Sequence, residues 1–250
     1  LSAGGTAADA AVALYFALAV TYPSAAGLGG GGVCVLHHPF DAKVEALDFT
    51  AGRPARRARD GQPEFAVPGN VRGMAALHAR YGKLRWSQVI QPAERLARFG
   101  SSVSRAFAHE LRRYEAIVNS SGGLSDLLKG ANGAILKEGD DLRQLDLSVV
   151  LGAVRGKGAG EFYSGILARR VAAAYQAAGG TVTIEDLRGF RPVWRQTLKG
   201  SFGNHDVHFA PPPVLGGDVA ARLWDALKEK GAYRRAGAEA RDHAIVKASA

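Results

Sequence analysis

The sequence has one cysteine, and it has no apolar run long enough to cross a membrane. A single cysteine excludes an internal disulfide framework. The most apolar segment, residues 3–20, is interrupted by Gly4, Gly5 and Asp9, so it falls short of the roughly 18 residues that a span needs. We therefore expect no membrane span. The chain begins inside this pattern without an initiator Met, so it carries no information on targeting in either direction.

The sequence also lacks the common motifs of a complete active site. It contains no G-x-S-x-G nucleophile elbow, no Walker sequence and no H-E-x-x-H motif. The pairs His37-His38 and His205/His208 fall in predicted strands, where residues one or three apart point to opposite faces and chelate a metal poorly. Cys34 has no charged neighbour, which is typical of a buried inert thiol. We therefore expect no metal, no cofactor and no catalytic residue in this chain.

Positive charge is abundant: the net charge is +9, from 32 Lys and Arg against 23 Asp and Glu. The arginines gather at 53–59, 112–113, 169–170 and 234–235. A nucleic-acid-binding protein would interleave aromatic residues for base stacking or carry a recognised motif, and neither is present. We expect no nucleic-acid partner. The charge indicates a basic solvated surface or an interface with an acidic partner chain.

The most distinctive segment is Gly27-Leu-Gly-Gly-Gly-Gly-Val33. Gly27, Gly29 and Gly32 match the G-x-G-x-x-G spacing of dinucleotide-binding sites. That fingerprint requires a strand before the glycines and a helix after them. Here a predicted helix precedes them and a predicted strand, 33–36, follows. The segment therefore predicts a closely packed helix-to-strand turn rather than a nucleotide site.

Hydrophobic periodicity predicts a mixture of helices and strands along the whole chain. The expected helices cover residues 3–20, 69–81, 86–99, 104–117, 144–155, 161–178 and 216–230. The expected strands cover residues 33–37, 43–49, 193–200 and 205–210. Ser87 is the expected N-cap of the helix 86–99, Gly179 ends the helix 161–178, and Thr183 caps the next turn.

Several blocks carry a family resemblance. The first two are Gly4–Val12 and Pro23–Gly32. The later blocks are residues 44–49, 67–73, 81–82, 91–93, 161–163, 179–180, 185–187 and 211–217. In this order they resemble the large subunit of the γ-glutamyltransferase family, and they cover nearly the whole chain.

The resemblance implies an α+β protein with the four-layer αββα fold of N-terminal nucleophile hydrolases. Residues 1–250 would form a single domain, the large-subunit portion of a heterodimer, with both ends truncated. Such proteins are made as inactive precursors that cleave themselves ahead of a threonine. That N-terminal Thr of the partner small subunit attacks the γ-glutamyl amide, with its own amino group as base. The resemblance further implies a small-molecule amide substrate and a periplasmic or secreted location.

One departure from the family leaves the substrate open. The family has an Arg directly after the Leu-Asp-Phe segment, where it can pair bidentately with a substrate α-carboxylate. Here Phe49 is followed by Thr50, and the next arginine is Arg53. Thr50 cannot make the charged contact, whereas Arg53 is either its replacement or an exposed loop arginine. Three functions follow: γ-glutamyl transfer or hydrolysis, a cephalosporin- or glutaryl-type amide acylase, or a non-catalytic scaffold or binding protein retaining the fold.

Two further features have structural interpretations that we favour over functional ones. Asp48 lies within a predicted buried strand, which indicates a hydrogen-bonding acid. The block Pro211–Gly217 is either a wall of a cleft or a rigid connector between a strand and a helix. We favour the connector, because none of its side chains can do acid–base or nucleophilic work.

Overall fold

The computed structural model describes residues 1–38, 41–61, 63–229, 237 and 241. The arginines at 234–235 and the last position of the expected helix 216–230 lie outside these residues. The chain divides into two compact units, each described by itself. Unit 1 comprises Leu1–Gly31 and Ala51–Arg191, and unit 2 comprises Gly32–Thr50 and the described residues after Arg191. The expectation of a single domain stays a prediction.

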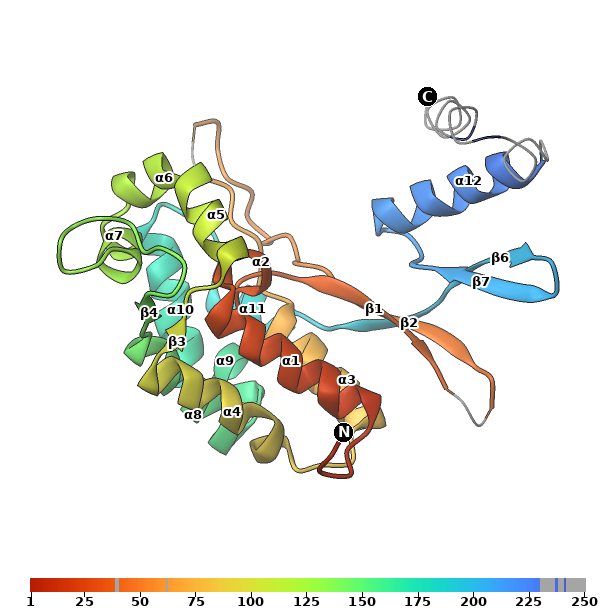
Figure 1. Cartoon of the computed structure of the whole chain (residues 1–250), viewed down its shortest axis with the longest axis horizontal. Coiled ribbons are helices and arrows are strands. Elements are labelled where there is room, and N and C mark those ends of the chain that lie inside the picture. The colour runs from red at the N-terminus through yellow and green to blue at the C-terminus, as the bar shows by residue number, and fades with distance from the viewer. Residues whose placement is uncertain (39–40, 62, 230–236, 238–240, 242–250) are drawn as a thin grey trace. The chain divides into compact units, whose positions relative to one another are not determined.

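Unit 1 is mainly helical (Figure 1). Its helices are α1 Ala7–Thr21, α2 Pro23–Ala26, α3 Asn70–Tyr81, α4 Trp86–Phe99, α5 Arg105–Arg113, α6 Glu115–Ser120, α7 Gly122–Leu128, α8 Leu145–Lys157, α9 Gly160–Ser164, α10 Ile166–Ala177 and α11 Ile184–Gly189. A short antiparallel ribbon joins β3 Ser101–Ser102 to β4 Asp141–Leu142. Helix α4 packs between α1 and α8, and α3 packs on α1.

Helix α1 is apolar on every side, yet only part of its surface is covered. Val12, Phe16 and Val20 are fully buried, and the Phe16 ring meets the Trp86 ring of α4 edge to face. Leu14 lies two residues from both Val12 and Phe16, on the other side of the helix, and is 60% exposed. A second core lies under α5 to α7 and consists of Val103, Phe107, Ala108, Leu111, Val118, Leu128, Leu136 and Leu142.

Unit 2 contains an antiparallel sheet in the order β1-β2-β5. Its strands are β1 Gly32–His37, β2 Val44–Phe49 and β5 Val193–Gln196. A separate hairpin pairs β6 Leu198–Phe202 with β7 His205–Phe209, and α12 Leu215–Glu229 follows it. Trp224 of α12 packs against Phe202 and Phe209 of the hairpin. The α+β class is confirmed.

Several expected boundaries were wrong, and each difference has a local cause. The first helix begins at Ala7 rather than residue 3, because Thr6 and Asp9 form a reciprocal capping box. The N-cap of α4 is Arg85 rather than Ser87, and Gln88 accepts the Arg85 N–H at 3.0 Å. By contrast, Thr183 caps α11 as expected, with Asp186 as its partner.

Three expected elements are each divided in two. The helix 104–117 breaks at Tyr114, and the strand 193–200 breaks at Thr197 between strands of two different sheets. The helix 161–178 breaks at Gly165, where an added Cβ would lie 2.2 Å from the Glu161 carboxylate. Its end is as expected, since Gly179 follows α10 with φ +80°. In the described part of the chain, no helix has the length and apolarity of a membrane span.

Candidate functional site

The glycine-rich segment is tied to the start of α3. The Gly30 carbonyl accepts the backbone N–H groups of Gly69 (2.8 Å) and Asn70 (3.1 Å), and the Asn70 side chain donates to the Gly27 carbonyl at 2.9 Å. A Cβ on Gly30 would lie only 3.0 Å from Asn70 Nδ2, so the close approach favours glycine. Two blocks of the resemblance therefore meet in unit 1. The helix-before-strand order that argues against a dinucleotide site is confirmed.

Arg72 of α3 holds the end of α11. Its guanidinium lies 4.0 Å from the centre of the Tyr163 ring, and it donates to the carbonyls of Leu187 (3.3 Å), Arg188 (3.3 Å) and Phe190. The Tyr163 hydroxyl donates to Pro68 O at 2.9 Å and accepts the Arg72 N–H at 3.1 Å. Burial raises the pKa of Tyr163 to about 12. Every group is directed at another part of the fold, so this cluster is structural.

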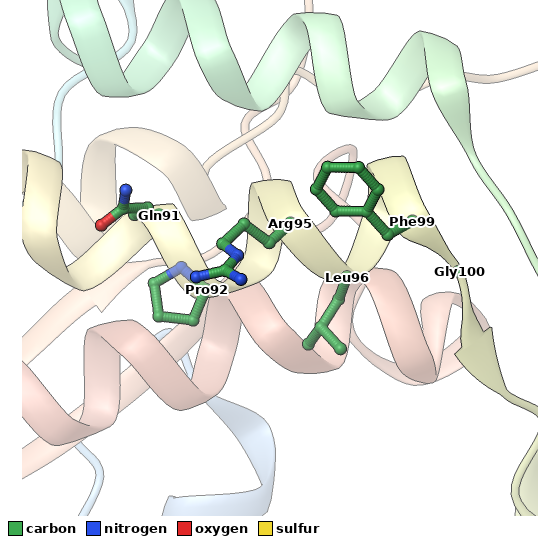
Figure 2. A pocket seen from close by; sticks show the side chains of 6 residues that line it. All are labelled: Gln91, Pro92, Arg95, Leu96, Phe99 and Gly100. Carbon is green, nitrogen blue, oxygen red and sulfur yellow. The ribbon is translucent and has the colours of Figure 1, made fainter.

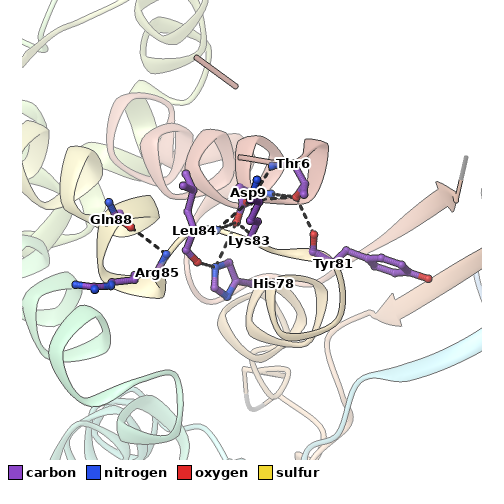
Figure 3. Close-up of polar contacts among 8 residues, drawn as sticks. All are labelled: Thr6, Asp9, His78, Tyr81, Lys83, Leu84, Arg85 and Gln88. Atoms are coloured by element: carbon purple, nitrogen blue, oxygen red, sulfur yellow. Dashed lines mark hydrogen bonds and ion pairs between the residues drawn. The ribbon is translucent and has the colours of Figure 1, made fainter. Parts of the chain in front are cut away.

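Asp9 is the centre of a second network in unit 1, which Figure 3 shows. Its carboxylate accepts the backbone N–H groups of Thr6 (2.7 Å), Lys83 (2.9 Å) and Leu84 (3.3 Å). Burial alone would raise the pKa of Asp9, but these hydrogen bonds outweigh it and hold the pKa below its usual range. His78 Nε2 lies 3.4 Å from the carboxylate. The network joins the start of α1 to the loop between α3 and α4.

At the end of β2, unit 2 has a different acid network. Asp48 Oδ1 accepts the backbone N–H of Thr50 at 3.0 Å and its hydroxyl at 2.8 Å. Asp48 Oδ2 accepts Nε of Arg195, on β5, at 2.9 Å. Asp48 is 6% exposed, whereas the Arg195 side chain is 36% exposed. The expectation that Asp48 is a hydrogen-bonding acid agrees with this geometry.

The charge of Asp48 is stabilised by these three donors. Burial acts to raise its pKa, but the Thr50 and Arg195 hydrogen bonds hold the pKa below its usual range. Asp48 is therefore an anion at neutral pH and cannot act as a general base without losing its partners. The sequence analysis did not single out Arg195. Its only local signal is that it is the charged residue of the strand Val193–Gln196, and nothing local indicates its partner.

Arg53 lies on an exposed loop that is anchored on both sides of it. Gly52 exchanges two backbone hydrogen bonds with Val67, at 2.9 and 2.7 Å. Pro54 is buried, and the Ala55 N–H donates to Asp186 at 2.8 Å. The Arg53 side chain is exposed and makes no hydrogen bond or ion pair with the described residues. Thr50 is thus brought to Asp48 and Arg195, and none of the described residues orients the Arg53 guanidinium.

Two of the four candidate histidines and the cysteine have local explanations. His38 bonds Asp41, and His208 bonds Thr197, each at 2.7 Å. Within the residues that the structure describes, no group of three or more His, Cys, Asp or Glu side chains could hold a metal ion. Burial raises the pKa of the half-buried Cys34 thiol, which keeps it protonated and weakly nucleophilic.

An open hollow of about 460 Å³ lies on α4, lined by Gln91, Pro92, Arg95, Leu96, Phe99 and Gly100 (Figure 2). None of these residues is a sequence candidate, and the hollow holds no acid–base pair. In unit 2, a Cβ on Gly217 would lie 2.0 Å from the Ala210 carbonyl oxygen, whereas a Cβ on Gly216 would meet nothing within 4 Å. Only Gly217 is needed for the close start of α12, which supports the connector interpretation of residues 211–217.

Comparison with known proteins gives a consistent result. The family model described as Gamma-glutamyltranspeptidase matches residues 1–246. The glutathione hydrolase proenzyme of Escherichia coli (strain K12) is 36% identical over 244 residues, which is 91% of this chain. The crystal structure of Helicobacter pylori γ-glutamyltranspeptidase superposes with a TM-score of 0.92 at 29% identity, over 99% of this chain and 76% of that one.

The extent and the strength of these likenesses differ between the relatives. This chain spans 42% of the length of the Escherichia coli relative, so the match covers less than half of that protein. The cephalosporin acylase of Bacillus halodurans has a TM-score of 0.87 at 24% identity, over 99% of this chain and 49% of that chain, which is a likeness of fold alone. The fold of the described residues is that of γ-glutamyltranspeptidases, which confirms the N-terminal nucleophile hydrolase class.

Proposed function

The chain belongs to the γ-glutamyltranspeptidase family, and on that premise we propose that it is the large-subunit portion of an enzyme that transfers or hydrolyses the γ-glutamyl group of glutathione-like amides. The observation that carries the proposal is the family match over residues 1–246 together with the shared fold. The name of the Escherichia coli relative, a glutathione hydrolase proenzyme, supports the same reaction and a precursor form.

The nucleophile is proposed to lie on a partner small subunit cut from the same precursor and beginning with Thr. Its hydroxyl would attack the amide carbonyl, its α-amino group would take the proton, and water or an acceptor amine would resolve the acyl-enzyme. Within the described residues, the buried acids Asp9, Glu45 and Asp48 are each held by hydrogen bonds or an ion pair and offer no alternative nucleophile.

Exposed apolar side chains on two helices of unit 1 also support a partner chain. Leu14 and Leu18, one turn apart on α1, are 60% and 36% exposed, and Val149 on α8 is 62% exposed. A helix that is apolar on all sides is normally buried in the complete protein. We propose that further polypeptide covers α1. The periplasmic or secreted location likewise remains a proposal, taken from the family.

Thr50 and Arg53 are the proposed substrate-binding positions from the sequence. Arg53 is supported by its exposed guanidinium, which has no hydrogen-bond or ion-pair partner among the described residues, and Thr50 by its position directly after β2. If Arg53 binds the substrate α-carboxylate, Arg53→Ala raises KM strongly for a γ-glutamyl amide. An unchanged KM would exclude Arg53 from that role.

The test uses the full-length protein. N-terminal sequencing and intact mass should detect a second, co-purifying chain that begins with Thr. The processed protein should release p-nitroaniline from γ-glutamyl-p-nitroanilide, and replacing the new N-terminal Thr by Ala should abolish both cleavage and release. An uncut, inactive protein would contradict the proposal.

A second candidate function is an acylase acting on cephalosporin- or glutaryl-type amides. Thr50 favours it, because the position next to the strand carries no cation for an α-amino acid head group. An acylase should ignore γ-glutamyl-p-nitroanilide and cleave glutaryl-p-nitroanilide, which lacks the α-amino group. A non-catalytic scaffold should cleave neither, even with its partner chain present.

A further inference from the structure

Arg195 shares one face of the unit 2 sheet with Asp48 and Thr50. Strands β2 and β5 pair antiparallel, with Arg195 directly opposite Ala46. Residues two apart on a strand lie on the same face, so Ala46, Asp48 and Thr50 form one row and Arg195 lies beside it. The hydrogen bonds agree, since Asp48 accepts from both Thr50 and Arg195.

The guanidinium of Arg195 is oriented but only partly used. An arginine has five N–H donors in a planar fork. Nε is bonded to Asp48 at 2.9 Å, and within the described part of the chain the two terminal nitrogens have no hydrogen-bond partner. The side chain is 36% exposed. Asp48 therefore holds the guanidinium at Nε. The two terminal nitrogens can donate two parallel hydrogen bonds to a carboxylate.

Neither sequence candidate offers the same geometry. The Thr50 side chain is uncharged, and its hydroxyl already donates to Asp48. Arg53 is charged, but none of the described residues orients it. A flexible arginine loses side-chain entropy when it binds, whereas a guanidinium that is already held loses less. Arg195 is charged and partly exposed, and its bond to Asp48 fixes the plane of its guanidinium.

We propose that Arg195 binds the α-carboxylate of the acyl group and thereby replaces the arginine that is absent from position 50. Asp48 is then a positioning residue, which orients the fork through Nε. This inference rests on the proposed function, because it names the residue that recognises a γ-glutamyl head group. It concerns binding alone and includes no bond-making step.

The test compares two amides that differ only in the α-carboxylate: γ-glutamyl-p-nitroanilide and 4-aminobutyryl-p-nitroanilide. Arg195→Lys keeps a cation beside Asp48 and removes the fork. We expect KM for the first amide to rise about 10- to 100-fold, the size of a charge-assisted hydrogen bond, with kcat little changed and the second amide unaffected. The matched control is Arg222→Lys, because Arg222 also bonds an acid through Nε at 2.9 Å.

Two results would overturn the inference: an equal loss on both amides, which marks a structural role, or no change on either. If the wild-type full-length protein cleaves neither amide, titration calorimetry is used to measure the binding of L-glutamate and of 4-aminobutyrate, which lacks the α-carboxylate. Glutamate binding that is weakened by Arg195→Lys supports Arg195 and overturns only the proposed reaction. A wild-type protein that does not bind glutamate overturns the assignment of Arg195.

Discussion

Asp9 in unit 1 and Asp48 in unit 2 are both buried aspartates with lowered pKa, but their partners differ. Asp9 accepts mainly backbone N–H groups, and its network ends within the fold. Asp48 accepts from Thr50 and from Arg195, whose terminal nitrogens have no hydrogen-bond partner among the described residues. The comparison teaches that burial and a lowered pKa alone do not show whether an acid serves only the fold or also positions a binding residue, the role proposed for Asp48. What differs between the two acids is that Arg195, the partner of Asp48, has N–H groups that bond none of the described residues.

The largest expected effect is on stability, from Asp9→Ala. The change leaves the N–H groups of Thr6, Lys83 and Leu84 without their acceptor. We expect a loss of about 3 kcal/mol, which lowers Tm by roughly 6–12 °C in a domain of this size. Scanning calorimetry measures it. The control is Asp146→Ala, an exposed acid in the first turn of α8, which should change stability by less than about 0.5 kcal/mol.

Asp48→Asn should affect substrate binding as well as stability, and this distinguishes the Asp48 network from the Asp9 network. An amide keeps part of the Thr50 contact but loses the charge that holds Arg195. We expect a loss of about 1–2 kcal/mol, together with a rise in KM for γ-glutamyl-p-nitroanilide. Asp9→Asn should lower Tm without that change in KM. If both variants affect KM alike, the proposed difference between the two acids does not exist.

Thr50→Val should have a smaller effect. The substitution preserves shape and removes the hydroxyl that donates to Asp48 at 2.8 Å, while the backbone bond at 3.0 Å remains. The expected loss is about 1 kcal/mol, the value of one hydrogen bond. Thr21→Val is the control, since the Thr21 hydroxyl bonds a carbonyl of its own helix. Equal Tm shifts would show that the Thr50 hydroxyl adds nothing specific.

The smallest expected change is in how steeply the free energy of unfolding falls at acidic pH. The pKa of each acid lies below its usual value of 3.8 in the folded protein. Each therefore stabilises the fold fully above that value, and this contribution is lost as pH falls through the lowered pKa. Thermal melts at decreasing pH should show a flatter decline for Asp9→Asn and Asp48→Asn. An unchanged slope in either variant would contradict the lowered pKa of that acid.

Local signals in the sequence predicted much of the fold. Helix α4 has the expected bounds 86–99, and α11 has the expected cap, because periodicity and capping act between near neighbours. Errors arose where a competing local interaction was overlooked. Thr6 and Asp9 form a T-x-x-D capping box that moves the start of α1, and Gly165 ends a helix that its neighbours would continue.

The candidate site was predictable only in part. The sequence located the end of β2, the substitution at Thr50 and the loop arginine Arg53. It could not indicate Arg195, whose bond to Asp48 joins residues 147 positions apart. Strand pairing over that separation depends on the register of β2 against β5, and no neighbouring residue encodes that register.

The sequence by itself determined the family, the α+β class and the departure at position 50, because ordered motifs and local periodicity survive in a linear chain. Only the tertiary structure decided which charges meet. Antiparallel pairing brings Arg195 beside Asp48, while Asp9 is enclosed by backbone donors from the α3–α4 loop. The physical reason is that an acid's role is set by the donors that surround it in space, and Lys83, Leu84 and Arg195 come from distant parts of the chain.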